Sequence, residues 1–544
     1  MSQDKIKTFR YDRERMRERT LEAPVWIHFG AGNLFRAFPA RLAEQLLNEG
    51  HTDKGVIVVE GFDKEIVQRI YRPYKDVYWN AVLESDGKCT IEKVGSIAAS
   101  FTAAPGTPED WNRLKELFTK PSLQMVSFTI TEKGYSLENG KGELLPEVEE
   151  DLRWGLQSPG SYMGRVTALL YERFLKGGAS LALVSMDNCS ENGDRLYEAV
   201  TRIASGWVNN GFCPEEFLHY LQDKNRVSYP ITMIDKITPS PMPEIGEKIS
   251  LLETEFSQGS FKVLETARGT KIAPFVNSEV CEYLVIEDTF PNGRPRLEKC
   301  GVYFTDRESV ERVERMKVGC CLNPLHTALA ICGTLLGYKT MAEAMRDEDL
   351  ERLIAHLAYR EGMPVLLPQK VIEPESFLYD VLKKRLPNPY MGDKLERIAT
   401  DTSQKLGVRF GGTIKAHEVA RLGSAKDLIC VPLVFAAWLR YLSGTDDSGN
   451  SFTISPDRGN VKALEAVKEV TENFKEKHVL KEILTGSEKL RAVMEDENIW
   501  GVNLISCGLD NRVYDYYLAM NCGEGSVRNM IKRAVKREDS YGYR

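Results

Sequence analysis

Short apolar runs separated by stretches of helical spacing dominate the first half of this chain and set its fold class. The runs are VWIHF at 25–29, GVIVVE at 55–60, LQMVSFTI at 123–130 and SLALVS at 180–185. Such runs are typical of strands buried on both faces, and strands that alternate with helices form parallel sheets. The pattern therefore predicts an α/β domain built on a doubly wound parallel sheet.

One segment interrupts this alternation. Between the second and third runs, VYWNAVLESDGKCTIEKVGSI at 77–97 alternates polar and apolar residues around Ser85-Asp86-Gly87. Alternation on both sides of a turn signal predicts a β-hairpin, which we expect to be inserted into the sheet.

A second domain is predicted after residue 305, where the pattern becomes helical. Thr305 and Glu308 have capping-box spacing, and DRESVERVERMKVGCCL at 306–322 follows with apolar residues at helical intervals. We therefore expect an N-terminal arm at 1–20, a Rossmann-type nucleotide-binding domain at 21–305 that contains the hairpin, and a mostly α-helical domain at 306–544.

Composition and charge exclude several classes of protein. The chain has 544 residues and a net charge of −7, with both signs mixed along its length, so nucleic acid is not an expected partner. The charged N-terminus has no apolar core of a signal peptide, and the apolar stretch at 428–439 is too short to span a membrane. We expect a cytoplasmic protein that is not attached to a membrane.

The metal-ligating residue types show no metal-site spacing. The 11 cysteines form no C-x-x-C pair, and the 7 histidines form no H-E-x-x-H motif. The sequence therefore predicts reduced thiols and catalysis without a metal.

A glycine-rich turn follows the first predicted strand. Gly30, Gly32, Asn33 and Leu34 belong to the segment GAGNLFR, where two glycines allow backbone amides to approach a pyrophosphate. Phe35 replaces the third glycine of the usual dinucleotide fingerprint, so an ordinary strand-to-helix turn explains the segment about equally well.

Polar groups also follow the other predicted strands, where ligands of open α/β sheets collect. Glu60 and Asp63 end the second strand and are alternative partners for a ribose diol, which favours NAD over NADP. Two further sets follow the third and fourth strands, namely Thr131, Glu132 and Lys133, and then Asp187 and Asn188.

The start of the helical domain carries the residues best suited to catalysis. Lys317, Asn323 and His326 lie in an otherwise apolar segment, and Pro324 predicts that one helix ends there and another begins, with Asn323 as a possible cap. A desolvated lysine can act as a base and asparagine amides can stabilise an oxyanion. A helix cap, a core histidine and a surface lysine are the structural alternative.

Several segments resemble those of a known family in the same order along the chain, and this resemblance favours the catalytic roles over the structural ones. GAGNLFRAF, TEKGY at 131–135, MDN at 186–188, MIDKITP at 233–239 and LNPLHTALA resemble the mannitol dehydrogenase family of long-chain polyol dehydrogenases over most of the chain. The resemblance implies a Rossmann domain and a helical domain around a cleft, NAD as cofactor and no zinc. It implies Lys317 as general base, Asn188 and Asn323 as oxyanion donors, His326 as a substrate-orienting group and Asp235 as a substrate contact.

The chain departs from the family pattern at the lysine. The family lysine precedes the asparagine by five residues, whereas Lys317 precedes Asn323 by six. The extra residue would turn the lysine by about 100° on a regular α-helix. A single π-helical turn would absorb it, so we predict a helical irregularity between these two residues.

The segment DTSQKLGVRF at 401–410 resembles the substrate loop of the family's second domain. It offers Lys405 and Arg409 to a substrate carboxylate, although a solvated charged turn is the alternative. This segment and LNPLHTALA are most similar to the branch that interconverts D-fructuronate and D-mannonate. Mannitol 2-dehydrogenase and tagaturonate reductase activities are the alternatives within the family, and a catalytically inactive nucleotide sensor is the alternative outside it. The oligomeric state is not predicted.

Overall fold

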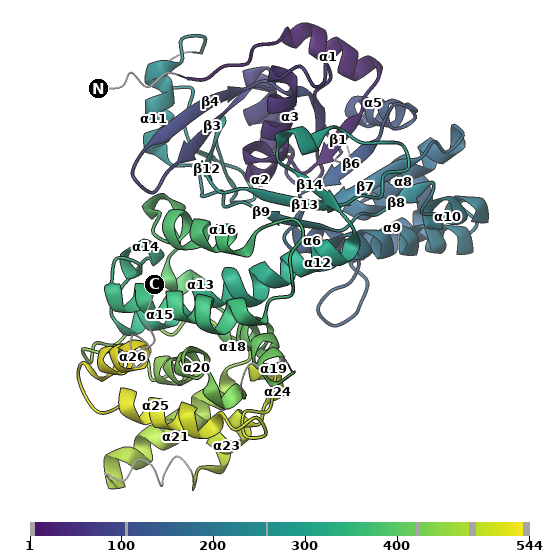
Figure 1. The fold of residues 1–544 in the computed structure, drawn as a ribbon. Helices are drawn as coiled ribbons and strands as arrows, with labels where there is room; N and C mark the ends of the chain where they lie inside the picture. The colour runs from purple at the N-terminus through teal and green to yellow at the C-terminus, as the bar shows by residue number, and fades with distance from the viewer. Residues whose placement is uncertain (1–5, 104–106, 257–258, 420–423, 478–485, 537–544) are drawn as a thin grey trace. The chain divides into compact units, whose positions relative to one another are not determined.

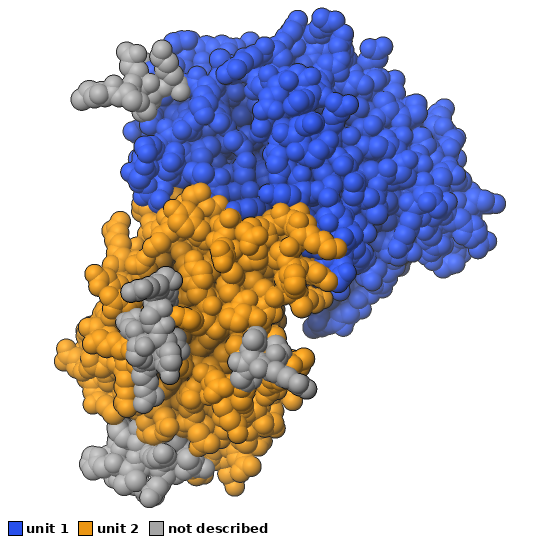
Figure 2. Space-filling model, viewed as in Figure 1, with its two compact units in different colours: residues 1–311 blue, residues 312–544 orange. Residues whose placement is uncertain are grey.

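The computed structural model describes residues 6–103, 107–256, 259–419, 424–477 and 486–536. The chain divides into two compact units, residues 1–311 and residues 312–544 (Figure 2). The division falls within helix α12 (Arg307–Met316). Each unit is described by itself below.

A six-stranded parallel sheet forms the centre of the first unit (Figure 1). Its strand order is β5-β2-β1-β6-β7-β8, with all neighbouring strands parallel. The strands are β1 (Trp26–Phe29), β2 (Val56–Glu60), β5 (Ile97–Thr102), β6 (Met125–Phe128), β7 (Leu181–Ser185) and β8 (Val227–Ser228). The four apolar runs correspond to β1, β2, β6 and β7, so the predicted doubly wound sheet is confirmed.

Helices cover both faces of this sheet because its strands are apolar on both sides. Ile27 and Phe29 of β1 belong to one buried cluster, whereas Trp26 of the same strand belongs to another. The first cluster includes residues of α5 (Pro108–Phe118), α8 (Tyr162–Leu175), α9 (Asn192–Asn209) and α10 (Glu215–Gln222). The second includes residues of α2 (Asn33–Ala37) and α3 (Pro39–Asn48).

The predicted hairpin forms, but it does not join the central sheet. Strands β3 (Tyr78–Leu83) and β4 (Cys89–Val94) pair antiparallel, and β3 also pairs in parallel with β12 (Phe275–Glu279) in a separate sheet. The expected insertion into the central sheet is therefore wrong. The reason is that β5 pairs with the outer side of β2 and leaves no place there for the hairpin.

A third sheet extends the first unit toward α12. It has the order β14-β13-β9, with strands β9 (Thr232–Asp235), β13 (Tyr283–Glu287) and β14 (Tyr303–Thr305). Asp306 caps α12 by accepting a hydrogen bond from the backbone N–H of Ser309 at 2.9 Å. The expected capping role of Thr305 is therefore wrong by one residue.

The second unit is almost entirely helical. Its longer described helices are α13 (Asn323–Leu335), α15 (Glu348–His356), α19 (Gly412–Val419), α20 (Cys430–Tyr441), α21 (Val461–Lys477), α25 (Asp510–Met520) and α26 (Ser526–Lys536). Helix α20 corresponds to the long apolar stretch and is buried along its whole length. The predicted α-helical character of this half of the chain is confirmed.

The helical irregularity after Lys317 is also confirmed. Segment η5 (Lys317–Cys321) is a π-helix, and the backbone N–H of Leu322 donates to the Lys317 carbonyl at 3.1 Å. Leu322 then leaves the helical conformation, and α13 begins at Asn323 with Pro324 in its first turn. Leu322 is the N-cap of α13 and Asn323 is its first helical residue, so the possible capping role of Asn323 is wrong.

One helical stretch meets a membrane criterion by length and composition alone. Residues Arg307–Leu335 are long and apolar enough to span a bilayer, but 72% of the most apolar window is buried inside the structure. Core helices of globular proteins pass the same test, so this stretch is weak evidence for a membrane span.

Candidate active site

The glycine turn between β1 and α2 has two glycines with different roles. Gly30 has a φ of +104°, and a Cβ added there would lie 2.2 Å from the carbonyl oxygen of Thr129. Gly32 has an ordinary φ of −77°, and a Cβ added there would meet nothing within 4 Å. Gly30 is therefore required by the fold, whereas the space beside Gly32 is open for a ligand to approach the backbone.

Phe35 explains why the third glycine of the fingerprint is dispensable here. Its buried ring stacks on His28 with centroids 4.1 Å apart, and the Leu34 and Asn33 positions before it form the first turn of α2. The Oδ1 atom of Asn33 accepts a hydrogen bond from buried Arg36 at 2.7 Å. Asn33, a predicted cofactor-binding residue, is thus tied to Arg36 within α2 through its side-chain oxygen.

His28 lies beneath this turn in a closed polar network. Its ring nitrogens are 2.6 Å from Ser127 Oγ and 2.9 Å from Thr129 Oγ1, and Trp26 Nε1 donates to the same Ser127 oxygen at 2.7 Å. Burial lowers the pKa of His28 to about 3. The imidazole is therefore neutral at physiological pH and acts as a structural link between β1 and β6.

Glu60 and Asp63 lie at the end of β2, as predicted, but they differ in what they bind. The carboxylate of Glu60 accepts hydrogen bonds from the backbone N–H groups of Ala31 (3.0 Å), Phe62 (2.7 Å) and Asp63 (3.0 Å). It therefore joins the glycine turn to the turn after β2. Burial raises the pKa of Glu60, while these backbone donors oppose that rise.

Asp63 is the better candidate for a ribose contact. Its Oδ1 accepts from the backbone N–H of Glu65 at 3.2 Å, whereas its Oδ2 is buried and has no hydrogen-bond partner among the described residues. A buried acceptor without a donor is unfavourable, and a ribose hydroxyl would satisfy it. The open backbone at Gly32 and this acceptor together fit a dinucleotide.

Asp187 joins the turns that follow β6 and β7. Its carboxylate accepts from the backbone N–H groups of Ile130 at 2.8 Å and Thr131 at 2.9 Å, and from the hydroxyl of Tyr135 at 2.6 Å. Thr131 has a φ of +64°, which is unusual for a residue with a branched side chain. Asp187 holds this strained turn immediately beside the exposed Asn188.

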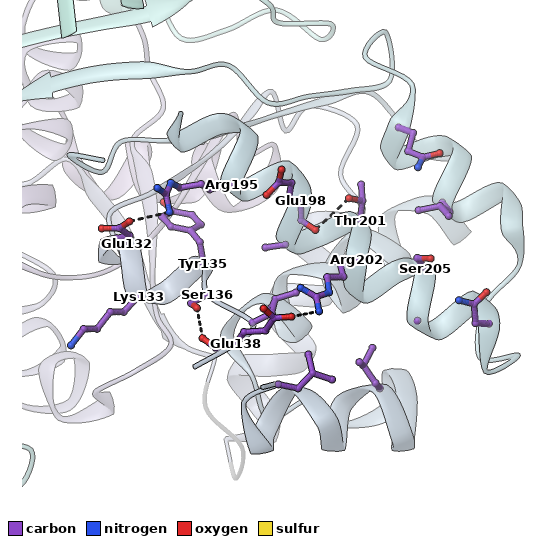
Figure 3. A pocket seen from close by; sticks show the side chains of 18 residues that line it. Glu132, Lys133, Tyr135, Ser136, Glu138, Arg195, Glu198, Thr201, Arg202 and Ser205 are labelled. Carbon is purple, nitrogen blue, oxygen red and sulfur yellow. Dashed lines mark hydrogen bonds and ion pairs between the residues drawn. The ribbon is translucent and has the colours of Figure 1, made fainter. Parts of the chain in front are cut away.

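Glu132 and Lys133, which follow Thr131 in the sequence, line an open pocket of about 1040 Å³ in the first unit (Figure 3). Glu132 forms an ion pair with Arg195 at 2.9 Å across it, and Lys133 also lines it. Helix α6 (Thr131–Tyr135) and helix α9 supply these side chains. Glu132 is thus engaged with a side chain of α9, and the exposed Lys133 is the more available of the two for a ligand.

Asp235 ends β9 and is 5% exposed. Asn192 connects this strand to the turn after β7, because its amide nitrogen donates to the carbonyl oxygens of Asp187 (2.9 Å) and Thr232 (3.0 Å). One buried asparagine therefore links the turn that carries Asn188 to strand β9, whose last residue is Asp235.

In the second unit, Lys317 is 3% exposed and begins the π-helix η5. Asn323 and His326 are half-buried on the first turns of α13. Segments η6 (Leu357–Gly362) and η10 (Gly407–Gly411) pack against η5, and both are also π-helical. Single π-helical turns occur often at functional sites, and here three of them meet around the predicted base.

Arg409 and Lys405 lie one helical turn apart on α18 (Thr402–Leu406) and η10. Arg409 Nη1 donates to the carbonyl oxygen of Asn323 at 3.1 Å and to the hydroxyl of Thr327. Lys405 Nζ donates to the carbonyl oxygens of Ile398 and Thr400. Both predicted cations are therefore anchored by backbone oxygens rather than fully solvated.

Burial disfavours the charged form of both cations. Burial lowers the pKa of Arg409 to about 10. Burial, and then the charge of Arg409, lower the pKa of Lys405. Burial without a carboxylate partner disfavours a charged guanidinium, and an anionic ligand would relieve that cost.

The structure thus brings predicted residues together in three places, two in the first unit and one in the second. The glycine turn, Glu60 and Asp63 come together in the first unit, as do Thr131 and Asn188, whereas Asn323 and Arg409 meet in the second. Sequence analysis missed Asp187, His28 and Asn192 as organising residues, and only the position of Asp187 at a strand end signalled its role. In the part of the chain that is described, no group of three or more His, Cys, Asp or Glu side chains is arranged to hold a metal ion.

Comparison with known proteins places this geometry in a family. The model of the mannitol dehydrogenase Rossmann domain matches residues 25–299, and that of the mannitol dehydrogenase C-terminal domain matches residues 309–508. A D-mannonate oxidoreductase of Thermotoga maritima is 42% identical over 531 residues, which cover 97% of this chain and 96% of the relative.

Two solved structures share the fold. A substrate-free D-sorbitol dehydrogenase has a TM-score of 0.76 at 23% identity and covers 97% of each chain. The mannitol 2-dehydrogenase of Pseudomonas fluorescens, solved with NAD and D-mannitol, has a TM-score of 0.67 at 24% identity and covers 98% of this chain and 97% of its own.

Proposed function

Because this chain belongs to the mannitol dehydrogenase family and is an oxidoreductase that acts on CH–OH groups, we propose that it interconverts D-fructuronate and D-mannonate with NAD(H). The observation that carries this choice is the 42% identity, along almost the whole chain, to a D-mannonate oxidoreductase. We propose further that catalysis needs no metal ion and that the protein works in the cytoplasm. It is not expected to bind nucleic acid or a membrane.

The cofactor assignment rests on the first unit. Gly30 fixes the tight turn, Gly32 leaves the backbone open to a pyrophosphate, and Asp63 Oδ2 offers an acceptor to a ribose hydroxyl. A carboxylate in this position would repel the 2'-phosphate of NADP, so NAD is the favoured dinucleotide. A bound nicotinamide ring supplies the hydride acceptor in oxidation and the hydride donor in reduction.

The chain's own groups would manage the proton and the developing charge. In oxidation, Lys317 Nζ takes the proton of the substrate hydroxyl as the C–H bond breaks and the C=O bond forms; in reduction, it returns that proton. The amide groups of Asn188 and Asn323 would donate hydrogen bonds to the substrate oxygen and stabilise its negative charge. His326 would orient the neighbouring hydroxyl group, and Asp235 would accept a hydrogen bond from another.

A hexuronate differs from a neutral ketose by its carboxylate, and this is what Arg409 and Lys405 would recognise. Arg409 donates from Nη1 to Asn323 and Thr327, and its guanidinium makes no other hydrogen bond within the described part of the chain. Its remaining N–H groups suit a planar carboxylate. The half-buried cation pair, in which Arg409 has no acidic partner among the described residues, supports an acidic sugar over a neutral polyol.

Initial rates of NADH oxidation test the proposal directly. Purified protein should oxidise NADH fastest with D-fructuronate, more slowly with D-tagaturonate and least with D-fructose, and D-mannonate should support the reverse reaction. Preference for D-fructose would instead identify a mannitol 2-dehydrogenase, and preference for D-tagaturonate a tagaturonate reductase. Tight NADH binding without turnover on any of these sugars would identify the inactive sensor.

A further inference from the structure

The turn after β2 carries an exposed aromatic residue, Phe62, between Glu60 and Asp63 in the sequence. Phe62 is 64% exposed, although both Glu60 and Asp63 beside it are buried. The guanidinium carbon of Arg268 lies 4.2 Å from the centre of the Phe62 ring. A large exposed apolar side chain beside a ligand site, already covered on one side by a planar cation, forms a flat surface suited to stacking.

Arg268 comes from a distant part of the chain and is held in place by backbone contacts. It lies in the turn between β10 (Leu264–Glu265) and β11 (Lys271–Ile272). The backbone N–H of Ala267 donates to Glu65 at 2.8 Å, and Arg69 donates to the carbonyl oxygen of Glu265 at 2.9 Å. The tip of this hairpin is therefore docked against α4 (Lys64–Ile66), the helix that Asp63 caps.

The turn that carries Phe62 is also fixed from behind. A Cβ added at Gly61 would lie 2.5 Å from the ring of Tyr162, and Arg165 donates to the Gly61 carbonyl at 2.8 Å. Phe62 thus projects from a rigid turn, next to an acceptor, Asp63 Oδ2, that has no partner among the described residues. The rigid turn, the unmet acceptor and the stacked cation point to the same ligand, a nucleoside with a ribose and a planar base.

We propose that Arg268 and Phe62 bind the adenine ring of the dinucleotide and that the β10–β11 hairpin is the wall of the adenosine end of the site. This inference rests on the proposed function, because it assumes that Gly32 and Asp63 receive a dinucleotide. The guanidinium and the ring provide stacking area and the positive charge favours the nearby phosphates, so both residues contribute to affinity and neither takes part in hydride transfer.

The test compares three ligands by isothermal titration: NADH, ADP-ribose and reduced nicotinamide mononucleotide, which has no adenosine. Arg268→Ala should lower the affinity for NADH and for ADP-ribose by about 5- to 10-fold, which corresponds to a stacking and cation–π contribution of about 1 to 1.4 kcal/mol. It should leave the mononucleotide and the kcat at saturating NADH unchanged. Arg268→Lys keeps the charge and loses the planar group, so its affinity for NADH and ADP-ribose should lie between those of the unchanged protein and Arg268→Ala.

The matched control is Lys271→Ala, which removes a cation from the same hairpin without disturbing the stack. It should bind all three ligands as the unchanged protein does. The inference is overturned if Arg268→Ala binds NADH with unchanged affinity, or if its affinity for the mononucleotide falls as much as its affinity for NADH. Failure of the unchanged protein to bind either NADH or ADP-ribose would overturn the proposed cofactor itself, and with it the role of the hairpin.

Discussion

The two glycines of the first turn allow stability and cofactor binding to be separated with matched substitutions. Gly30→Ala places a Cβ 2.2 Å from the Thr129 carbonyl oxygen at a φ of +104°. The left-handed backbone costs alanine about 1–2 kcal/mol, and displacement of packed neighbours costs about 1–3 kcal/mol. The free energy of unfolding should therefore fall by about 2–5 kcal/mol, a large part of a domain's usual stability.

Gly32→Ala should behave in the opposite way. The added Cβ meets nothing within 4 Å and the backbone has a φ of −77°, so no strain is introduced. Reduced freedom of the unfolded chain should leave stability unchanged or raise it by up to about 1 kcal/mol. The methyl group would, however, occupy the space from which a pyrophosphate approaches the backbone amides, and NADH binding should weaken by at least about 10-fold.

Urea denaturation followed by tryptophan fluorescence, together with NADH titration of each variant, checks both expectations. Gly30→Ala should unfold at a clearly lower urea concentration, whereas Gly32→Ala should unfold with the unchanged protein and bind NADH poorly. If Gly32→Ala binds NADH normally, the open space beside Gly32 is not where the dinucleotide lies, and the cofactor site must be sought elsewhere in the first unit.

Three further predictions address the predicted base, the cation pair and the buried histidine. Lys317→Ala should reduce kcat by about 10²- to 10⁴-fold while the Kd for NADH stays the same, and unchanged turnover would remove Lys317 from the mechanism. Arg409→Met should raise the KM for D-fructuronate by about 10-fold or more but leave the residual rate with D-fructose unaffected; an equal loss with both sugars would argue against carboxylate recognition. His28 has a pKa of about 3 in the folded protein and about 6.5 when unfolded, so the unfolded state takes up a proton as the pH falls below about 6.5 and the folded state does not. Stability should therefore drop by about 2 kcal/mol between pH 7.5 and pH 5, and a His28→Asn variant that retains the same pH dependence in urea denaturation would contradict this assignment.

The sequence predicts best those features that depend on neighbours in the chain. The apolar runs identify β1, β2, β6 and β7 because each strand is buried on both faces. The glycine turn is predictable because its position after β1 requires a residue that tolerates the φ of Gly30. A helix break beside Pro324 is predictable because proline has no N–H group to continue the preceding helix, although the break falls at Leu322, one residue before Asn323.

Features that depend on contacts between distant segments could not be predicted in this way. Glu60 was a candidate for the ribose, but its carboxylate is engaged by three backbone N–H groups, one of them from Ala31. The sheet that the hairpin joins is not predictable from its own sequence, because its partner β12 lies almost 200 residues further along the chain. The stacking of Phe35 on His28 has no local signal, since either ring alone is an ordinary core residue.

The π-helix after Lys317 combines both kinds of information. The sequence shows one residue more than the family spacing between Lys317 and Asn323, and a π-helical turn accommodates an extra residue without changing the direction of the residues before and after it. What stabilises that turn is distant: a Cβ added at Gly362, in the neighbouring π-helix η6, would lie 3.3 Å from the Cβ of Cys320. Gly362 therefore provides the room into which η5 widens. The length of the segment predicts that a bulge is needed, and the lack of a side chain at Gly362 leaves room for it beside Cys320.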